Sequence, residues 1–214
     1  MQVTVSASTR YDVVIDSGVI GVCGEYFRRL FLPCKIAVIT DDNVKPLYFD
    51  AVKSSLEKCG YMVVCYTIKA GEESKNLVVY GDILSFLAKH DFTGSDIITS
   101  LGGGVGGDLA GFVAATFHRG IKLVHIPTTL LAAIDSSVGG KTGVNLDGIK
   151  NIIGAFCQPK GVIVDPALTK TLPARQVSNG LAEAVKMALT FDPDLFALFE
   201  NGDPAKDLEK IIVR

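Results

Sequence analysis

Short continuous apolar runs alternate with amphipathic segments along most of this 214-residue chain. A short, fully apolar run is typical of a strand buried on both faces, and an apolar position every three or four residues is typical of a helix packed on a sheet. The predicted strands are residues 35–40, 61–68, 96–100, 122–126 and 161–165, and the predicted helices are residues 18–32, 46–59, 76–89 and a segment from 109. This alternation predicts a doubly wound, Rossmann-like α/β fold with a mostly parallel sheet that helices cover on both faces.

The N-terminal region follows a different pattern. Residues 3–5 and 11–15 alternate apolar and polar side chains on either side of Ser8–Arg10. Alternation with a period of two is typical of a half-buried strand, so these segments predict a hairpin at the edge of the sheet.

A second departure is the amphipathic segment 172–189, which predicts a helix after the last strand. In a helix, Asn179, Glu183 and Lys186 share one face because they are four and three residues apart. The spacing leaves three roles open for Glu183, as a metal ligand, as a base or as half of a surface pair with Lys186, and it favours the surface pair.

The most distinctive stretch is the glycine-rich turn at residues 100–111, which lies between the predicted strand 96–100 and the helix from 109. Glycines are expected here to adopt positive φ and to let the backbone approach a ligand, while the helix N-terminus attracts an anion. The turn therefore predicts a phosphate site, although its spacing matches neither the usual dinucleotide fingerprint nor a Walker A loop. A tight turn that needs small residues for helix–strand packing is the alternative.

Polar residues follow the predicted strands at four places: Asp41 with Asn43, residues 71–75, Asp108 in the glycine turn, and residues 127–129. Ligands of doubly wound sheets bind beyond the carboxyl ends of the strands, so these groups are expected to meet at one edge. Helix capping is the alternative explanation for each of them, and for Thr128 above all.

Residues 135–145 are polar and rich in glycine, and residues 147–156 resume the apolar character. Together they predict a long irregular segment, of which residues 135–151 fold over this edge. The lysines Lys141 and Lys150, with Asp135 and Asn151 nearby, could hold a substrate that carries carboxylate or phosphate groups. Solvated surface lysines are the alternative.

Composition narrows the class of protein. The net charge is −2 with both signs interspersed, which favours neither nucleic acid nor an anionic membrane as a partner. The longest uncharged run, Leu123–Ile134, is too short to span a bilayer. The chain lacks a signal-peptide pattern at its start and has five cysteines without a Cys-x-x-Cys motif, so we expect reduced thiols in a cytoplasmic protein.

Several long blocks, in one order, resemble the sequence of the 3-dehydroquinate synthase family. The blocks are residues 102–112, 127–131, 135–142, 150–156 and 180–183, and the resemblance is continuous from about Lys35 to Lys186. It implies an enzyme of the shikimate pathway that converts 3-deoxy-D-arabino-heptulosonate 7-phosphate into 3-dehydroquinate and phosphate. It also implies NAD and a divalent metal, zinc or cobalt, as cofactors, and a homodimer.

The resemblance assigns roles to matching positions. The implied cofactor-binding residues are Asp41, Asn43, Gly71, Glu72, Lys75, Gly103, Gly104, Val105, Gly106, Gly107, Asp108, Thr128, Thr129, Asp135, Ser136, Lys141, Lys150, Leu168, Thr169, Lys170, Thr171, Leu172 and Asn179. The implied catalytic or substrate-holding residues are Arg119, Asp135, Lys141, Lys150, Asn151 and Lys186, with Arg119 acting across the dimer. Glu183 is the implied metal ligand.

The resemblance also divides the chain into an NAD-binding α/β domain, residues 1–172, and the first helices of an α-helical metal and substrate domain, residues 173–214. The chain departs from the family pattern at Gly106, Gln176 and Met187–Ala188. The family's two metal-binding histidines have no counterpart among these residues, so we expect the chain to be part of a longer enzyme and inactive alone. A related cyclase that makes an inosose or valiolone, and a noncatalytic nucleotide-binding module, are the alternatives.

Overall fold

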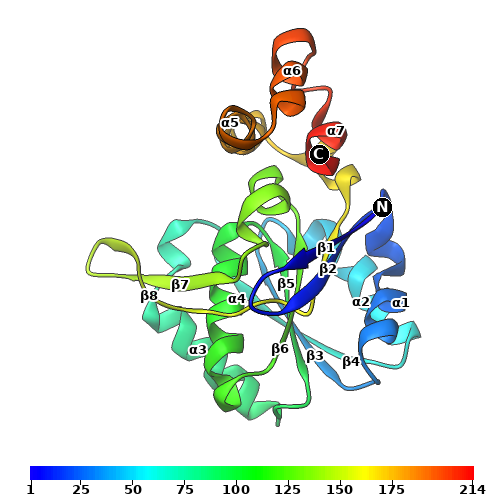
Figure 1. Ribbon diagram of the computed structural model, residues 1–214. Coiled ribbons are helices and arrows are strands. Elements are labelled where there is room, and N and C mark those ends of the chain that lie inside the picture. The colour runs from blue at the N-terminus through cyan, green and yellow to red at the C-terminus, as the bar shows by residue number, and fades with distance from the viewer.

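The computed structural model describes all residues from Met1 to Arg214 and contains one seven-stranded sheet and a separate hairpin (Figure 1). The strands are β1 (Gln2–Ser6), β2 (Arg10–Ile15), β3 (Lys35–Asp41), β4 (Met62–Ile68), β5 (Ile97–Gly102), β6 (Lys122–Pro127), β7 (Lys141–Leu146), β8 (Ile149–Phe156) and β9 (Gly161–Val164). The sheet order is β1-β2-β9-β6-β5-β3-β4, with β1 antiparallel to β2 and every other pair parallel. The predicted doubly wound α/β fold with an N-terminal hairpin is therefore confirmed.

Helices cover both faces of the sheet. The helices of the chain are α1 (Cys23–Leu30), α2 (Asp50–Lys58), α3 (Leu77–Lys89), α4 (Gly104–Thr116), α5 (Ala174–Phe191), α6 (Pro193–Asn201) and α7 (Leu208–Val213). Helices α3 and α4 lie on one face, and α1 and α2 lie on the other.

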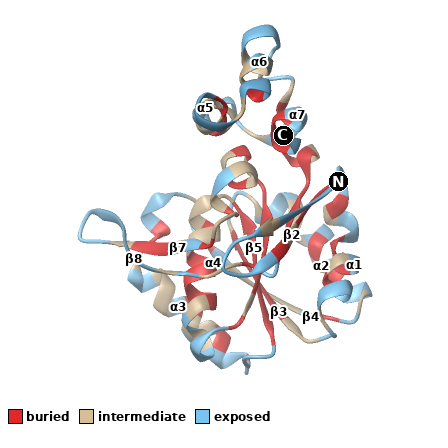
Figure 2. Ribbon diagram, viewed as in Figure 1, coloured by how far each residue is buried: buried red, intermediate tan, exposed pale blue.

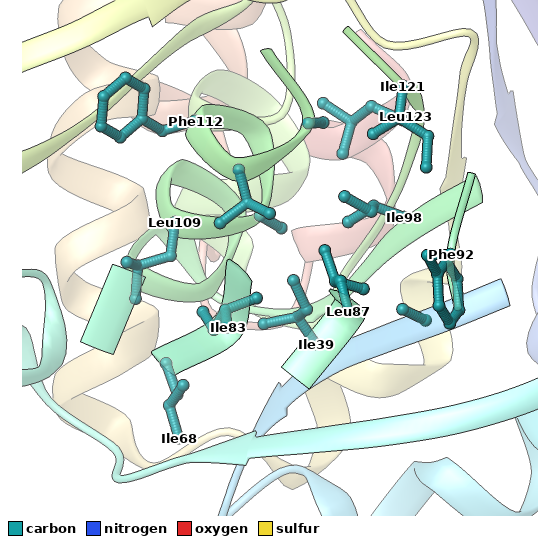
Figure 3. Close-up of a cluster of buried hydrophobic side chains, with 14 of the residues drawn as sticks. Ile39, Ile68, Ile83, Leu87, Phe92, Ile98, Leu109, Phe112, Ile121 and Leu123 are labelled. Atoms are coloured by element: carbon teal, nitrogen blue, oxygen red, sulfur yellow. The ribbon is translucent and has the colours of Figure 1, made fainter. Parts of the chain in front are cut away.

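Side-chain alternation along the central strands supplies two cores. Ile39 and Ile98 point towards α3 and α4, where they meet Leu87 and Leu109 (Figure 3). Their sequence neighbours Val38 and Ile97 point to the opposite face. Because both faces are covered, the central strands are buried along their length (Figure 2), which explains why they read as unbroken apolar runs.

The parallel register brings the carboxyl ends of the strands to one edge. Asp41 of β3 pairs with Ile68 of β4, and Gly102 of β5 pairs with Pro127 of β6. We call this edge, with the loops that follow β3, β4, β5, β6 and β9, the C-terminal rim. Figure 1 shows α5, α6 and α7 beyond this end of the sheet.

The expectation of an irregular segment at 135–156 is wrong from Lys141 onwards, where the chain forms the antiparallel hairpin β7–β8. Gly143 and Gly154 face each other there, and a Cβ on Gly154 would lie 2.0 Å from the Thr142 carbonyl oxygen. The close pairing requires glycine at these positions. Because glycine has a low strand propensity, the same residues made the strands hard to predict from the sequence.

Three predicted helices differ at their starts. Helix α4 begins at Gly104, inside the predicted glycine turn, rather than at 109. The predicted helix 18–32 divides into a 3-10 turn, Val19–Val22, and α1, and the predicted helix 46–59 begins as a wide π turn, Lys45–Phe49, before α2. The predicted helix at 172–189 is present as α5.

Helices α5 and α7 pack on the N-terminal hairpin, and α6 packs on α5 and α7. Leu208 and Ile212 of α7 join the cluster that contains Tyr11 and Val13 of β2. A cavity of about 490 Å³, lined mainly by apolar side chains, lies between this hairpin, α5 and α7. None of the helices combines the length and the apolar character needed to cross a bilayer.

Candidate nucleotide and substrate site

Loops from successive strands touch at the C-terminal rim. The amide N–H of Thr128 donates to the carbonyl oxygen of Gly102, at 2.9 Å. A Cβ on Gly102 would lie 3.6 Å from a carboxylate oxygen of Asp41, and one on Gly103 would lie 3.1 Å from a methyl carbon of Thr129. The loops after β3, β5 and β6 therefore lie against one another, as the order of the strands predicts.

Glycines in the turn provide close approach rather than unusual dihedral angles. None of the glycines from 102 to 107 has a positive φ, so that part of the prediction is wrong. Gly103 precedes α4 in an extended conformation, and no side chain caps the helix. A Cβ on Gly104 would lie 3.2 Å from the hydroxyl of Ser136. The first amide N–H groups of an uncapped helix have no intrahelical acceptor, so this turn offers donors to an anion.

Lys75 joins the loop after β4 to helix α4. Its ammonium group forms an ion pair with Asp108 and also donates to the side-chain oxygen of Asn151. The Lys75 side chain is only 6% exposed. Burial raises the pKa of the Asp108 carboxyl, and the hydrogen bond and charge of Lys75 oppose that rise. The pair thus holds two charges at the rim with little contact with solvent.

The tip of the β7–β8 hairpin is tied to the same place. Asn145 donates to the Glu72 carboxylate at 2.8 Å and accepts from the Asn151 amide at 2.9 Å. The Lys150 side chain is 72% exposed, and its ammonium lies 3.9 Å from a carboxylate oxygen of Glu72. Asn151 has a φ of 56°, a left-handed conformation that asparagine tolerates better than most residues. The structure therefore brings Lys150 and Asn151 beside Glu72 and Lys75.

A second charged group gathers where α5 faces the segment after β6. Glu183 and Lys186 form an ion pair on α5. The pKa of Asp135 is raised by burial and by the negative charge of Glu183, while the positive charges of Lys186 and Lys141 oppose the rise. These four groups are therefore electrostatic neighbours, and the surface pair that spacing favoured for Glu183 is also present. No group of three or more His, Cys, Asp or Glu side chains in the chain could hold a metal ion.

Other expected residues at the rim also have structural partners. Asp41 accepts from the amides of Asn43 and Val44, both at 2.9 Å, so it caps the following turn. Thr129, rather than Thr128, caps the next turn by accepting from the amide of Ala132. Thr128 itself is buried. The capping alternative is thus correct for Asp41 and Thr129, which still lie beside the glycine turn.

The remaining positions lie at the borders of the rim. Gly71 has a φ of 120° in the loop after β4. After β9, residues 168–171 end a 3-10 segment, Pro166–Thr171, and Leu172 follows it; Asn179 is exposed on α5. Val105, Gly106 and Gly107 belong to the first turn of α4.

Arg119 is not with these residues. It is exposed in the short turn between α4 and β6, at the opposite end of the sheet, and has a φ of 65°. Within a single copy of the chain, Arg119 therefore does not share the rim with the other expected site residues.

A buried polar pair lies beneath α4. The Ser100 hydroxyl is 2.6 Å from Nδ1 of His125, and both residues are almost fully buried. A Cβ on Gly107 would lie 4.0 Å from the His125 ring. Burial lowers the pKa of His125 to about 4. The imidazole is therefore neutral at physiological pH and supports the first turns of the helix.

Residues 65–179, more than half of the chain, match the family model described as "3-dehydroquinate synthase N-terminal". The chain belongs to the 3-dehydroquinate synthase family. The 3-dehydroquinate synthase of Streptococcus thermophilus (strain CNRZ 1066) is 49% identical over 193 residues, which are 90% of this chain and 54% of that protein. The chain thus spans about half the length of the curated relatives that it matches.

Solved structures of related cyclases have the same architecture as this chain, which is a member of the 3-dehydroquinate synthase family. A 2-deoxy-scyllo-inosose synthase complexed with carbaglucose-6-phosphate, NAD+ and Co2+ is 27% identical, with a TM-score of 0.86 over 100% of this chain and 61% of that chain. The 2-epi-5-epi-valiolone synthase of Streptomyces hygroscopicus subsp. jinggangensis 5008, with NAD+ and Zn2+ bound, is 27% identical, with a TM-score of 0.83 over 100% and 62%.

Sequence reasoning missed three residues that organise the rim of this family member. Asn145 connects the hairpin tip to Glu72, and Tyr48 contacts Thr171. Asp165 accepts from the amides of Gly18, Ile20 and Ala167. An aspartate between a strand and a proline is a recognisable cap, so Asp165 could have been found from the sequence. Asn145 and Tyr48 act over long sequence separations, which no local pattern reveals.

Proposed function

We propose that this chain forms the NAD-binding part of a 3-dehydroquinate synthase, which converts 3-deoxy-D-arabino-heptulosonate 7-phosphate into 3-dehydroquinate and phosphate. The observation that carries the proposal is the rim itself, where an uncapped glycine helix start, the Lys75–Asp108 pair and the hairpin residues Lys150 and Asn151 lie together. The 49% identity to a 3-dehydroquinate synthase supports this substrate. Residues 1–172 would be the nucleotide-binding domain, and residues 173–214 would begin a helical domain.

The residues at the rim suit a dinucleotide. Gly103 and Gly104 leave space that a Cβ would fill against Thr129 and Ser136, so a pyrophosphate can approach the free amides of α4. Bound NAD would take a hydride from a substrate alcohol and later return it. Asp41 and Lys75 would border the nucleotide on either side.

Charged residues of the hairpin and of α5 suit the sugar phosphate. The ammonium groups of Lys141 and Lys150 would hold carboxylate or phosphate oxygens, and the Asn151 amide would hold a hydroxyl. Asp135, with its raised pKa, takes up a proton on its carboxylate more readily than an exposed aspartate would. Lys186 would lie near the reacting carbons.

This chain supplies only part of a binding site for a divalent metal, zinc or cobalt. Glu183 is one proposed ligand and Asp135 is an electrostatic neighbour, but no third His, Cys, Asp or Glu side chain completes a site. The Glu183 carboxylate is held by Lys186 and accessible on α5.

Arg119 requires a second copy of the chain for any role at the rim. We propose a cytoplasmic homodimer in which Arg119 of one copy reaches the substrate phosphate of its partner, with neither nucleic acid nor membrane as a partner. Its exposed position at the opposite end of the sheet supports such a role.

A related sugar-phosphate cyclase is the second candidate function, because inosose and valiolone synthases match the whole chain with TM-scores of 0.86 and 0.83. Their 27% identity is lower than the 49% identity to the 3-dehydroquinate synthase. Thermal-shift titrations of the NAD-loaded protein with the heptulosonate phosphate, sedoheptulose 7-phosphate and glucose 6-phosphate separate the candidates. The proposal predicts the lowest dissociation constant for the heptulosonate phosphate.

Isothermal titration of NAD into the 214-residue protein tests the nucleotide site directly. We expect saturable binding that Gly104→Val abolishes, because its side chain would fill the space beside Ser136. Gly81→Ala on α3 is the matched control, since a Cβ there meets nothing within 4 Å. Absence of NAD binding by the wild-type protein, or equal binding by Gly104→Val, would contradict the proposal.

A further inference from the structure

Tyr48 connects two loops of the C-terminal rim that belong to different strands. It lies in the π turn Lys45–Phe49 after β3, and its hydroxyl is hydrogen-bonded to the hydroxyl of Thr171. Thr171 ends the 3-10 segment that follows β9. Strands β5 and β6 separate β3 from β9 in the sheet, so this single hydrogen bond links two loops across the width of the rim.

The Thr171 hydroxyl has two hydrogen-bond partners, the Tyr48 hydroxyl and the Leu168 carbonyl oxygen. It lies 2.9 Å from the Leu168 carbonyl oxygen and can donate to it. The Tyr48 hydroxyl also lies 3.5 Å from the Leu168 carbonyl oxygen, so either hydroxyl of the pair can donate to the other. In both arrangements the single Thr171 proton is used, by Leu168 or by Tyr48. Thr171 is exposed and retains a second lone pair. It therefore presents only an acceptor to a ligand at the rim.

The segment that carries Thr171 is fixed at both ends. Asp165, which is 3% exposed, holds its start through the amides of Gly18 and Ala167, at 3.0 Å each. Tyr48 holds its end. An acceptor whose position is fixed before binding loses less conformational freedom when a ligand arrives.

Tyr48 and the ion pair lie on opposite faces of the sheet. Tyr48 packs against the core beneath α1 and α2, whereas Asp108 belongs to α4 on the other face. A dinucleotide whose pyrophosphate lies on the glycine turn between them extends one half over each face. The proposed substrate residues Lys150 and Asn151 are on the α4 face, so the nicotinamide half belongs there and the adenosine half lies on the side of Tyr48.

We propose that Tyr48 is a positioning residue for the nucleotide. Its hydroxyl orients Thr171 as an acceptor for a donor group of the adenosine half, either a ribose hydroxyl or the 6-amino group. This inference rests on the proposed NAD site and specifies how that site holds the adenosine half.

Titration of NAD and of ADP-ribose into the 214-residue protein tests the inference. Loss of one net hydrogen bond in Tyr48→Phe is expected to raise both dissociation constants about three- to tenfold and by equal factors, because both ligands share the adenosine half. Thr171→Val removes the acceptor itself and is expected to weaken binding at least as much. The double variant Tyr48→Phe with Thr171→Val should bind no more weakly than Thr171→Val alone.

Tyr61→Phe is the matched control. The Tyr61 hydroxyl donates to the Phe31 carbonyl oxygen at 2.9 Å, away from the rim, so this variant loses a comparable hydrogen bond without touching the site. It should retain the wild-type dissociation constants. If wild-type protein fails to bind NAD, the proposed function falls and the inference falls with it. If wild-type protein binds and Tyr48→Phe binds equally well, or Tyr61→Phe weakens binding to the same extent, the inference alone is overturned.

Discussion

The packing of α4 against the hairpin leads to a specific stability prediction for Gly111→Ala. A Cβ on Gly111 would lie 2.2 Å from a methyl carbon of Thr142 in β7 and 3.0 Å from its Cβ. Ordinary contact between carbon atoms requires about 3.5–4.0 Å, so the helix or the hairpin must move. Such overpacking costs about 1–3 kcal/mol, which outweighs the gain of up to ~1 kcal/mol from replacing glycine by alanine in a helix.

We therefore expect Gly111→Ala to lower the free energy of unfolding by about 1–2 kcal/mol, since the overpacking cost exceeds the propensity gain. At the usual scaling for a protein of this size, this loss corresponds to a fall in Tm of roughly 2–8 °C. The measurement is urea unfolding followed by circular dichroism, with equal slopes confirming that only stability has changed.

Two further variants isolate the cause. Gly106→Ala is on the same helix, where a Cβ meets nothing within 4 Å, so it should leave stability unchanged or raise it by up to ~1 kcal/mol. Thr142→Ser removes the colliding methyl group but keeps the hydroxyl that donates to the Ala155 carbonyl oxygen, so it should partly rescue Gly111→Ala. A Gly111→Ala protein as stable as Gly106→Ala would refute the packing argument.

Two other predictions concern buried polar groups. Burial lowers the pKa of His125 from 6.5 to about 4. The folded state therefore has its full stability above pH 6.5, where His125 is neutral. As the pH falls from 6.5 towards 4, the free energy of unfolding decreases by about 3 kcal/mol in total. His125→Gln should flatten this pH dependence of unfolding, whereas His90→Gln at an exposed position should leave it intact; an unchanged slope in His125→Gln would disprove the assignment. Asp165→Asn weakens three hydrogen bonds to backbone amides and should lower stability by about 1–3 kcal/mol, against little change for the exposed Asp16→Asn, as measured by thermal unfolding.

The fold was predictable because its strongest signals are local. The central strands β3, β5 and β6 are covered on both faces, so they appear in the sequence as apolar runs that need no tertiary information to recognise. The grouping of Asp41, the glycine turn and Thr128 follows from the same parallel arrangement, since successive carboxyl ends meet at one edge.

The hairpin β7–β8 was not predictable in the same way. Its glycines are required by close approach of the two backbones, and Asn145 and Lys150 at its exposed tip contact Glu72 in the loop after β4. The contact between Tyr48 and Thr171 joins residues 123 positions apart. Such contacts depend on the assembled sheet, which a periodicity analysis does not contain.

The burial of α4 limits how far this helix can move when a ligand binds. Residues Leu109 to Ala114 are all buried, so this helix has no side facing water along that length. Their amide protons should exchange with deuterium only when the whole molecule opens, because the sheet lies against one side and the β7–β8 hairpin against the other. A nucleotide that binds at Gly104 would therefore contact a helix start that is already formed and nearly rigid. Induced fit would be confined to the exposed hairpin tip around Lys150.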